Sequence, residues 1–153
     1  MNRLTLLFAL CVAAPLYAQD DEEEVTIPAA DEWYKADYAP LYNDKPWDKV
    51  DEIVAFYAET LHEHGEGGGS HNAREWASGL LEEWKIEGWI RSELADLKTD
   101  MLNPTTASFK AKWRDYYAGG NIGYECSWYL ADFTDGKWVI SEYAVINCSD
   151  HGL

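Results

Sequence analysis

The apolar residues of this chain change their spacing near Gly88, and this change constrains the fold more than any other feature of the sequence. Before Gly88 they recur every three or four residues, which is typical of amphipathic helices. After it they alternate with polar residues, most clearly over 107–117, where Phe109, Ala111 and Trp113 alternate with lysine and arginine. This alternation indicates a strand with one buried face. Helices early in a sequence and strands late in it favour an α+β fold.

Two helices are predicted before Gly88. The first begins near Asp44 as its N-cap, has Pro46 in its first turn and ends at Gly65. Its apolar stripe is Trp47, Val50, Ile53, Val54, Tyr57 and Leu61. The second helix follows a glycine-rich loop, with Asn72 as its cap. Its apolar stripe is Trp76, Leu80, Leu81 and Trp84.

Strands are predicted over 90–102, 107–117, 123–133 and 137–147. Asp135-Gly136 separates the last two and is a strong hairpin signal, because both residues of a tight hairpin turn need a positive φ. Successive hairpins predict a curved antiparallel meander packed against the N-terminal helices.

The segment 31–47 is unusually aromatic. Tyr34, Tyr38 and Tyr42 have helical spacing, but Pro40 and Pro46 exclude one continuous helix through the whole segment. We expect a short helix or turn that packs its rings onto the domain. A carbohydrate-stacking surface is the functional alternative.

The N-terminus has the three parts of a secretory signal peptide. Arg3 supplies the positive start, Leu4–Ala14 is apolar but shorter than the ~20 residues that span a bilayer, and Ala18 is a small residue at the cleavage position. We predict a signal peptide at 1–18, an acidic disordered leader at 19–30 and one domain over 31–153. The mature protein is expected to be exported, to the periplasm or outside the cell.

The net charge of −16 limits the partners of the chain. An acidic surface repels the phosphates of nucleic acids and anionic lipid headgroups. We therefore expect no nucleic-acid partner, and no membrane association after removal of the signal peptide.

The cysteines agree with export. Cys11 leaves with the signal peptide, and Cys126 and Cys148 then form an even pair, which favours one disulfide. A two-residue turn at Asp135-Gly136 would place Cys126 opposite Val145, on the other face from Cys148. A β-bulge, or a position of Cys148 beyond the strand end, would remove this conflict.

Five segments of the C-terminal half occur in a recognisable order: 88–94, 102–105, 111–116, 128–130 and the hairpin Asp135-Gly136-Lys137-Trp138-Val139-Ile140. This ordered set resembles the NTF2-like (SnoaL-like) superfamily, whose members wrap a curved antiparallel sheet around helices to form a cone with an internal pocket. In this comparison the helix over Trp47–His64 corresponds to the opening helix of the family. The resemblance covers roughly residues 46–147.

The same resemblance implies a shortened middle region. Family members place a turn, a short helix and one or two strands between the first and the last helix, whereas only His64–His71 fills this place here. We expect a cone that is incomplete on this side or is covered by the aromatic segment 31–47.

Isomerases and dehydratases of this superfamily use a buried carboxylate or histidine as a base, with a tyrosine or an acid that polarises a carbonyl group. The candidate carboxylates on predicted strands are Glu93, Asp96, Asp100, Asp115, Glu125, Asp132 and Glu142. The candidate hydroxyl donors are Tyr116, Tyr129 and Tyr143. Because acids on the strands of an acidic protein usually face solvent, no catalytic residue is assigned.

Three histidines surround the glycine-rich loop and are weak candidates for a metal site: His62, His64 and His71. Imidazole groups bind Zn²⁺, Cu²⁺ or Ni²⁺, but this spacing matches no established site. The alternative is that they are solvated loop residues. No cofactor is predicted, since Gly65–Gly69 lacks the Lys-Ser/Thr that completes a phosphate-binding loop.

The sequence favours a non-catalytic role for the exported domain: binding of a small apolar or aromatic ligand, or of a protein partner. A proton-transfer enzyme of the isomerase or dehydratase type is the first alternative, and metal binding by the His62–His71 loop is the second. The resemblance also implies a homodimer paired through its sheets as a candidate assembly.

Overall fold

The computed structural model describes residues 27–153 of the chain. The predicted signal peptide, Cys11 and residues 19–26 of the predicted leader lie outside the described residues. Over 27–153, no helix combines the length and the apolar character needed to cross a membrane.

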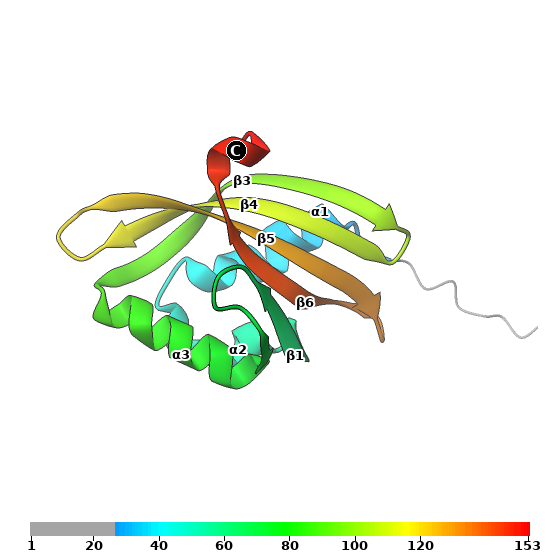
Figure 1. Ribbon diagram of the computed structural model, residues 1–153, viewed down its shortest axis with the longest axis horizontal. Coiled ribbons are helices and arrows are strands. Elements are labelled where there is room, and N and C mark those ends of the chain that lie inside the picture. Colours follow the sequence, from blue (N-terminus) through cyan, green and yellow to red (C-terminus); the bar gives the residue numbers. More distant parts are fainter. Residues whose placement is uncertain (1–26) are drawn as a thin grey trace, which may run out of the picture.

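The strands form one six-stranded mixed sheet, in the order β2-β1-β6-β5-β4-β3. They are β1 Tyr57–His64, β2 Ser70–Asn72, β3 Trp89–Asn103, β4 Thr106–Tyr117, β5 Ile122–Thr134 and β6 Lys137–Ile146. All neighbours are antiparallel except β1 and β6, which are parallel. The sheet is curved and open, and the helices lie together on its inner side (Figure 1). The predicted α+β class and the four-strand meander are confirmed.

The helix α3, Ala73–Ile86, covers part of the inner face of the sheet (Figure 1). Asn72 caps it as predicted, because its side-chain oxygen accepts hydrogen bonds from the backbone N–H groups of Arg74 and Glu75. Ala73, Ala77 and Leu81 form its most buried stripe. A short helix, α2 (Val50–Val54), lies next to α3.

The aromatic N-terminal segment is helical from Ala30 to Tyr42. It starts as α1 (Ala30–Trp33), widens into the π-helical η1 (Tyr34–Tyr38) and tightens into the 3₁₀ turn η2 (Ala39–Tyr42). Pro40 has no N–H group to donate and its ring crowds the preceding turn, so a change of helical repeat just before it is physically expected. The helical segment thus continues past Pro40 and ends before Pro46.

The helix predicted from Asp44 to Gly65 is wrong for most of its length. The chain forms the 3₁₀ turn η3 (Pro46–Asp48), then α2, and from Tyr57 onward the strand β1. Tyr57 and Leu61 are both buried, and a spacing of four places two residues on one face of a strand as well as of a helix. Pairing with β6 and β2, which is not local in sequence, decides in favour of the strand.

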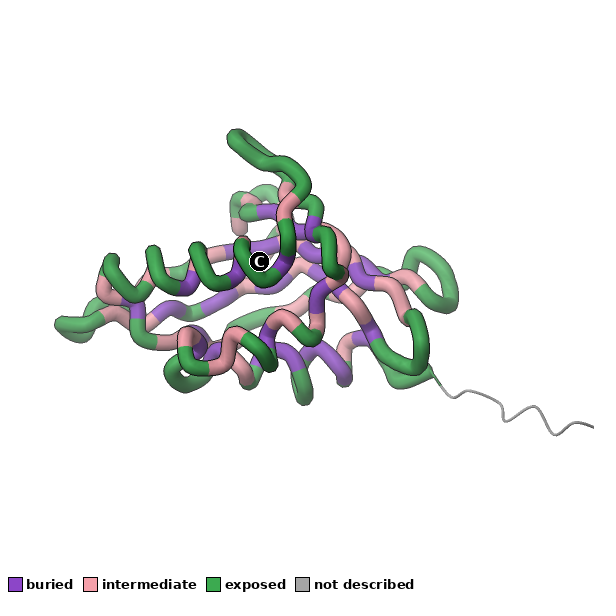
Figure 2. The backbone as a smooth tube through the Cα atoms, turned by 90° about the horizontal axis from the view of Figure 1, so that it is seen from below, coloured by how far each residue is buried: buried purple, intermediate pink, exposed green. Residues whose placement is uncertain are grey.

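The core lies between the helical segment and the inner face of the sheet (Figure 2). Tyr34 and Tyr38 have no exposed surface, and the Tyr34 ring stacks on Phe109 with ring centroids 4.9 Å apart. Trp138 is 1% exposed, and its indole N–H donates to the carbonyl oxygen of Pro28. The rings of 31–42 therefore serve mainly as core, as the packing interpretation predicts.

The disulfide between Cys126 and Cys148 is present. The structure contains both the β-bulge and the position of Cys148 beyond the strand end that could remove the register conflict. Leu130 pairs with Glu142 and Ala131 with Ile140, so Ser141 is an additional residue in β6, and Cys126 then lies opposite Ile146. Cys148 follows the strand end in the 3₁₀ turn η4 (Cys148–His151), which lies on the outer side of the sheet (Figure 1).

Candidate functional site

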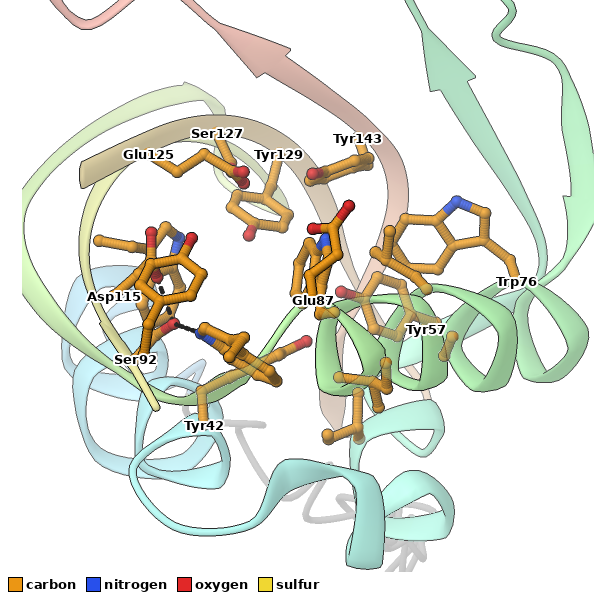
Figure 3. A pocket seen from close by; sticks show the side chains of 18 residues that line it. Tyr42, Tyr57, Trp76, Glu87, Ser92, Asp115, Glu125, Ser127, Tyr129 and Tyr143 are labelled. Atoms are coloured by element: carbon orange, nitrogen blue, oxygen red, sulfur yellow. Dashed lines mark hydrogen bonds between the residues drawn. The ribbon is translucent and has the colours of Figure 1, made fainter. Parts of the chain in front are cut away.

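A cavity of about 120 Å³ lies between the inner face of the sheet and α3. β3, β4, β5 and β6 supply one wall, α3 supplies the opposite wall, and Tyr42 and Tyr57 close another side (Figure 3). The volume is slightly smaller than the ~150 Å³ cavity that accommodates benzene in an engineered protein core. The cavity therefore has room for a molecule about the size of one small ring.

Two carboxyl groups reach this cavity from neighbouring strands. Asp115 lies opposite Gly123 and Trp113 lies opposite Glu125, so Asp115 and Glu125 are diagonal neighbours on the inner face. Asp115 is buried, with 7% of its surface exposed. The Ser92 hydroxyl donates a hydrogen bond to Asp115 and accepts one of 2.9 Å from the indole N–H of Trp89 (Figure 3).

Burial shifts the proton affinity of both carboxyl groups. Loss of hydration raises the pKa of Asp115, and the hydrogen bonds from Ser92 and Trp89 partly oppose this shift. Loss of hydration also raises the pKa of Glu125 to about 7, and the negative charge of Asp115 raises it further, while the Ser127 hydroxyl opposes the shift. Near neutral pH Glu125 therefore exchanges readily between its acid and its base form.

A group of buried tyrosines lies on the other side of the cavity. The Tyr38 hydroxyl is hydrogen-bonded to the hydroxyls of Tyr42, at 3.0 Å, and of Tyr57. Burial raises the pKa of Tyr57 and Tyr42, so both phenols stay neutral near neutral pH. The hydroxyl groups of Tyr129 and Tyr143 come from β5 and β6 and point toward the cavity (Figure 3).

Only some of the residues singled out in the sequence meet in this site. The structure brings together Asp115, Glu125, Tyr129 and Tyr143. The others lie outside the cavity: Glu93, Asp96, Asp100, Asp132, Glu142 and Tyr116. Glu93 accepts hydrogen bonds from Arg91 and, at 2.6 Å, from Tyr116 on the outer face, so it serves surface pairing.

Several residues of the site have no clear signal in the sequence. Glu87 follows α3 and lies beside the cavity, and Ser92 and Tyr42 line it (Figure 3). Ser92 occupies an inward position of β3 together with Trp89, but an irregularity between Trp89 and Arg91 interrupts the simple alternation. Because of this irregularity, simple alternation from Trp89 does not predict that Ser92 faces the core.

The three loop histidines lie on a hairpin and do not converge. His62 and His64 lie on the outer face of β1, where their rings contact Ser70, at 2.9 Å, and Glu142, at 2.6 Å. His71 lies on β2 opposite Leu61, with its Nε2 atom 3.3 Å from Glu63. Within residues 27–153, no group of three side chains is arranged to hold a metal ion.

The fold can be compared with known proteins. No family model matches the sequence, and no curated protein matches it significantly. A domain of unknown function with a cystatin-like fold from Nostoc punctiforme is 14% identical and superposes with a TM-score of 0.58, covering 83% of this chain and 84% of the other. A proposed scytalone dehydratase from Novosphingobium aromaticivorans is 15% identical, with a TM-score of 0.56 and coverages of 76% and 80%. A proposed polyketide cyclase from Xanthomonas campestris is 19% identical, with a TM-score of 0.52 and coverages of 75% and 88%.

This chain has the NTF2-like fold. The predicted shortening of its middle region is wrong. The first helical segment of this NTF2-like domain is 30–42, and the residues between it and α3 hold a 3₁₀ turn, a short helix and the β1–β2 hairpin. The error follows from placing the opening helix at Trp47–His64, where β1 lies. At identities below 20%, the likeness to solved structures concerns the fold alone.

Proposed function

We propose that the cavity of this NTF2-like domain binds a small aromatic or apolar molecule. The observation that carries the proposal is the cavity of about 120 Å³, whose lining contains four tryptophans and five tyrosines. Aromatic walls with a few polar groups are typical of small-molecule sites. The presence of a proposed cyclase and a proposed dehydratase among proteins of similar fold supports a small-molecule site here.

A cavity-filling variant tests this proposal. Ala77 lies on α3, is 2% exposed and lines the cavity, so Ala77→Met would extend a side chain into the space. Ser78→Met is the matched control, because Ser78 is exposed on the same helix. In a nuclear magnetic resonance screen of ring-sized compounds, bound compounds should shift the indole N–H signals of Trp89 and Trp113. Ala77→Met should abolish these shifts and Ser78→Met should retain them. Shifts that survive Ala77→Met would place the binding elsewhere.

Proton transfer is a second candidate function, and the environment of Glu125 favours it. A general base works best when its pKa lies near the working pH, and the pKa of Glu125 is about 7. The Tyr129 and Tyr143 hydroxyls point toward the same space and could donate hydrogen bonds to a developing negative charge on a substrate oxygen. In this proposal Glu125 removes a proton from a carbon next to a carbonyl group.

Deuterium exchange distinguishes binding from catalysis. A ketone that binds in the cavity should exchange its acidic carbon-bound protons for deuterium faster with the protein than without it. Glu125→Gln should remove the acceleration while binding persists, and Glu93→Gln on the outer face should leave it unchanged. An acceleration that survives Glu125→Gln would contradict the role of Glu125.

Export remains part of the proposal for the chain. The acidic charge, the Cys126–Cys148 disulfide and the predicted signal peptide support a location in the periplasm or outside the cell. Intact mass measurement of the protein from its native compartment should give a chain that begins at Gln19 and lacks two hydrogens. A chain that begins at Met1 would contradict export by cleavage.

A further inference from the structure

The cavity is acidic and contains no compensating cation. Asp115 and Glu125 lie on its sheet wall, and Glu87 lies beside it at the end of α3 (Figure 3). Among the described residues that line the cavity, none is lysine, arginine or histidine. An anionic ligand would be repelled by these groups, whereas a positively charged ligand would relieve the repulsion between them.

Four aromatic rings of the lining pack against one another in a row. Tyr57 packs against Trp76 with ring centroids 5.7 Å apart and planes inclined by 61°. Trp76 packs against Tyr143 at 5.1 Å and 64°, and Tyr143 packs against Tyr129 at 5.4 Å and 51°. Each ring is thus inclined steeply to the next, and the row extends along the wall of the cavity. Alkylated ammonium groups are attracted to the negative faces of aromatic rings, and the cavity lining is rich in such rings.

The arrangement of the acids favours an organic cation over a metal ion. Within residues 27–153, no three carboxyl, histidine or cysteine side chains converge closely enough to bind a metal. The cavity volume of about 120 Å³ suits a ligand of roughly five to seven non-hydrogen atoms, by comparison with the cavity that holds benzene. A tetraalkylammonium head is of this size, and it needs rings and nearby carboxylates but no direct ligand bonds.

We propose that the cavity binds a small alkylated ammonium ion, with its charged head against the aromatic rings of the lining and beside Glu125. This inference rests on the proposed small-molecule function and changes the ligand from an uncharged molecule to one whose alkyl groups surround a positive charge. The buried positions of Tyr129 and Tyr143, each 4% exposed with their hydroxyls toward the cavity, leave polar atoms available for a hydroxyl group on the ligand.

Choline and its uncharged carbon analogue 3,3-dimethylbutan-1-ol test the inference directly. The two molecules share size and shape and differ in the charge of the central atom. In titration calorimetry of the full domain, choline should bind at least about tenfold more tightly than the alcohol, since a desolvated cation–π contact is worth ~2 kcal/mol. Equal or weaker binding of choline would overturn the inference.

The outcomes separate this inference from the proposed function. If the alcohol binds as well as choline, the cavity is a small-molecule site without preference for cations, and only the ligand class is wrong. If neither binds while ring-sized compounds bind in a manner sensitive to Ala77→Met, the cation inference again fails alone. If no compound binds in either experiment, both fail.

Variants and pH provide an independent readout. Glu125→Gln keeps the shape of the side chain and should reduce the preference for choline to less than about threefold, while Glu93→Gln should not change it. The titratable groups that line the cavity with Glu125 are Asp115 and Tyr117 on β4, Tyr129 on β5, Tyr143 on β6, Tyr42, Tyr57 and Glu87. Of these groups, the carboxyls of Asp115 and Glu87 are the ones that share its negative charge.

A cation favours the ionised form of Glu125, so choline binding should release protons below pH 7. Its affinity should rise about tenfold between pH 6 and pH 8 and then level off. An affinity that is flat over this range would contradict the placement of the ammonium group beside Glu125. Circular dichroism at each pH would confirm that the domain remains folded.

Discussion

The two faces of strands β4 and β5 carry opposite chemistry, although their residues alternate along the same backbone. The inner face of β4 presents Phe109, Trp113 and the buried Asp115, and β5 adds Glu125 beside them. The outer face of the same two strands presents Lys110, Lys112, Arg114, Tyr116 and Tyr124. Two carboxyl groups thus face the cavity while the cations of both strands face outward, in a chain whose net charge is −16.

The same alternation continues in β3. Arg91 lies on the outer face, with its guanidinium carbon 3.8 Å from the centre of the Tyr116 ring, and Ser92 faces inward to Asp115. On the outer face, hydrogen-bond pairing lowers the pKa of Glu93, whereas on the inner face desolvation raises the pKa of Glu125. The chemical character of a carboxyl group here therefore depends on its face of the sheet more than on its position in the sequence.

The largest expected contrast is between two adjacent residues of β4. Phe109 has no exposed surface and packs on Tyr34, so Phe109→Ala should lower the free energy of unfolding by about 3–5 kcal/mol. Lys110→Ala, on the outer face, should change it by less than about 0.5 kcal/mol. Urea denaturation of both variants measures the difference. Similar losses in the two would contradict the assignment of the faces.

The disulfide lies on the outer face, but its loss should lower the free energy of unfolding about as much as the loss of a core side chain. Replacement of both Cys126 and Cys148 by alanine should lower the free energy of unfolding by roughly 3 kcal/mol, since their separation of 22 residues closes a sizeable loop in the unfolded chain. Thermal unfolding with and without a reductant measures it. The reductant should lower the melting temperature of the native protein and leave that of the double variant unchanged.

Glu125 and Glu93 should respond to substitution with opposite signs. The pKa of Glu125 is about 7 in the folded protein and lower in the unfolded chain, so the stability that its proton provides is lost as the pH rises toward 7 and above. Glu125→Gln should therefore raise the free energy of unfolding at pH 8 by about 1–3 kcal/mol, with little effect at pH 4.

Glu93→Gln is the matched control on the outer face. Hydrogen bonds from Arg91 and Tyr116 lower the pKa of Glu93, so this carboxylate stabilises the fold above its unfolded pKa. Its replacement should weaken the protein slightly at pH 8. Chemical denaturation at pH 4 and pH 8 compares the two variants, and a loss of stability in both at pH 8 would refute the desolvation of Glu125.

The smallest expected effect concerns the helix that covers the inner face. Asn72→Ala removes the acceptor for the backbone N–H groups of Arg74 and Glu75 and should cost about 1 kcal/mol. Asn121→Ala, in an exposed turn, should lower the free energy of unfolding by no more than about 0.5 kcal/mol. Hydrogen exchange should show faster opening at the start of α3 in the first variant only. No change there would mean that packing alone fixes the helix end.

The strands of the meander and α3 were predicted well because residues close together in the sequence determine them. The alternation of Phe109, Ala111 and Trp113 and the turn at Asp135-Gly136 fix the meander, and Asp135 indeed has a φ of 53° and Gly136 a φ of 80°. The strand β1 was misread because Tyr57 and Leu61 satisfy helical and strand spacing equally. Its partners β6 and β2 are distant in sequence or separated by a glycine loop, so no local pattern reports them.

The candidate site was predictable only in part. The correct carboxyl groups were among seven candidates, and alternation with Trp113 would have placed Asp115 inward. Whether Glu125 faces inward can be decided only from the pairing of β5 with β4. This pairing puts Glu125 opposite Trp113, whose side chain is on the inner face. Glu87 and Tyr42 reach the cavity from elements outside the meander, so their positions depend on how the helices pack.

The additional residue Ser141 in β6 has a consequence for how this chain tolerates changes in length. Ile140 pairs with Ala131 and Glu142 with Leu130, so Ser141 occupies no pairing position of its own. Its deletion would leave Tyr143 in the cavity wall and keep Cys126 opposite Ile146. A deletion elsewhere in β6 would instead turn the following side chains to the other face unless the bulge moved. Evolutionary insertions and deletions in this strand should therefore collect at Ser141.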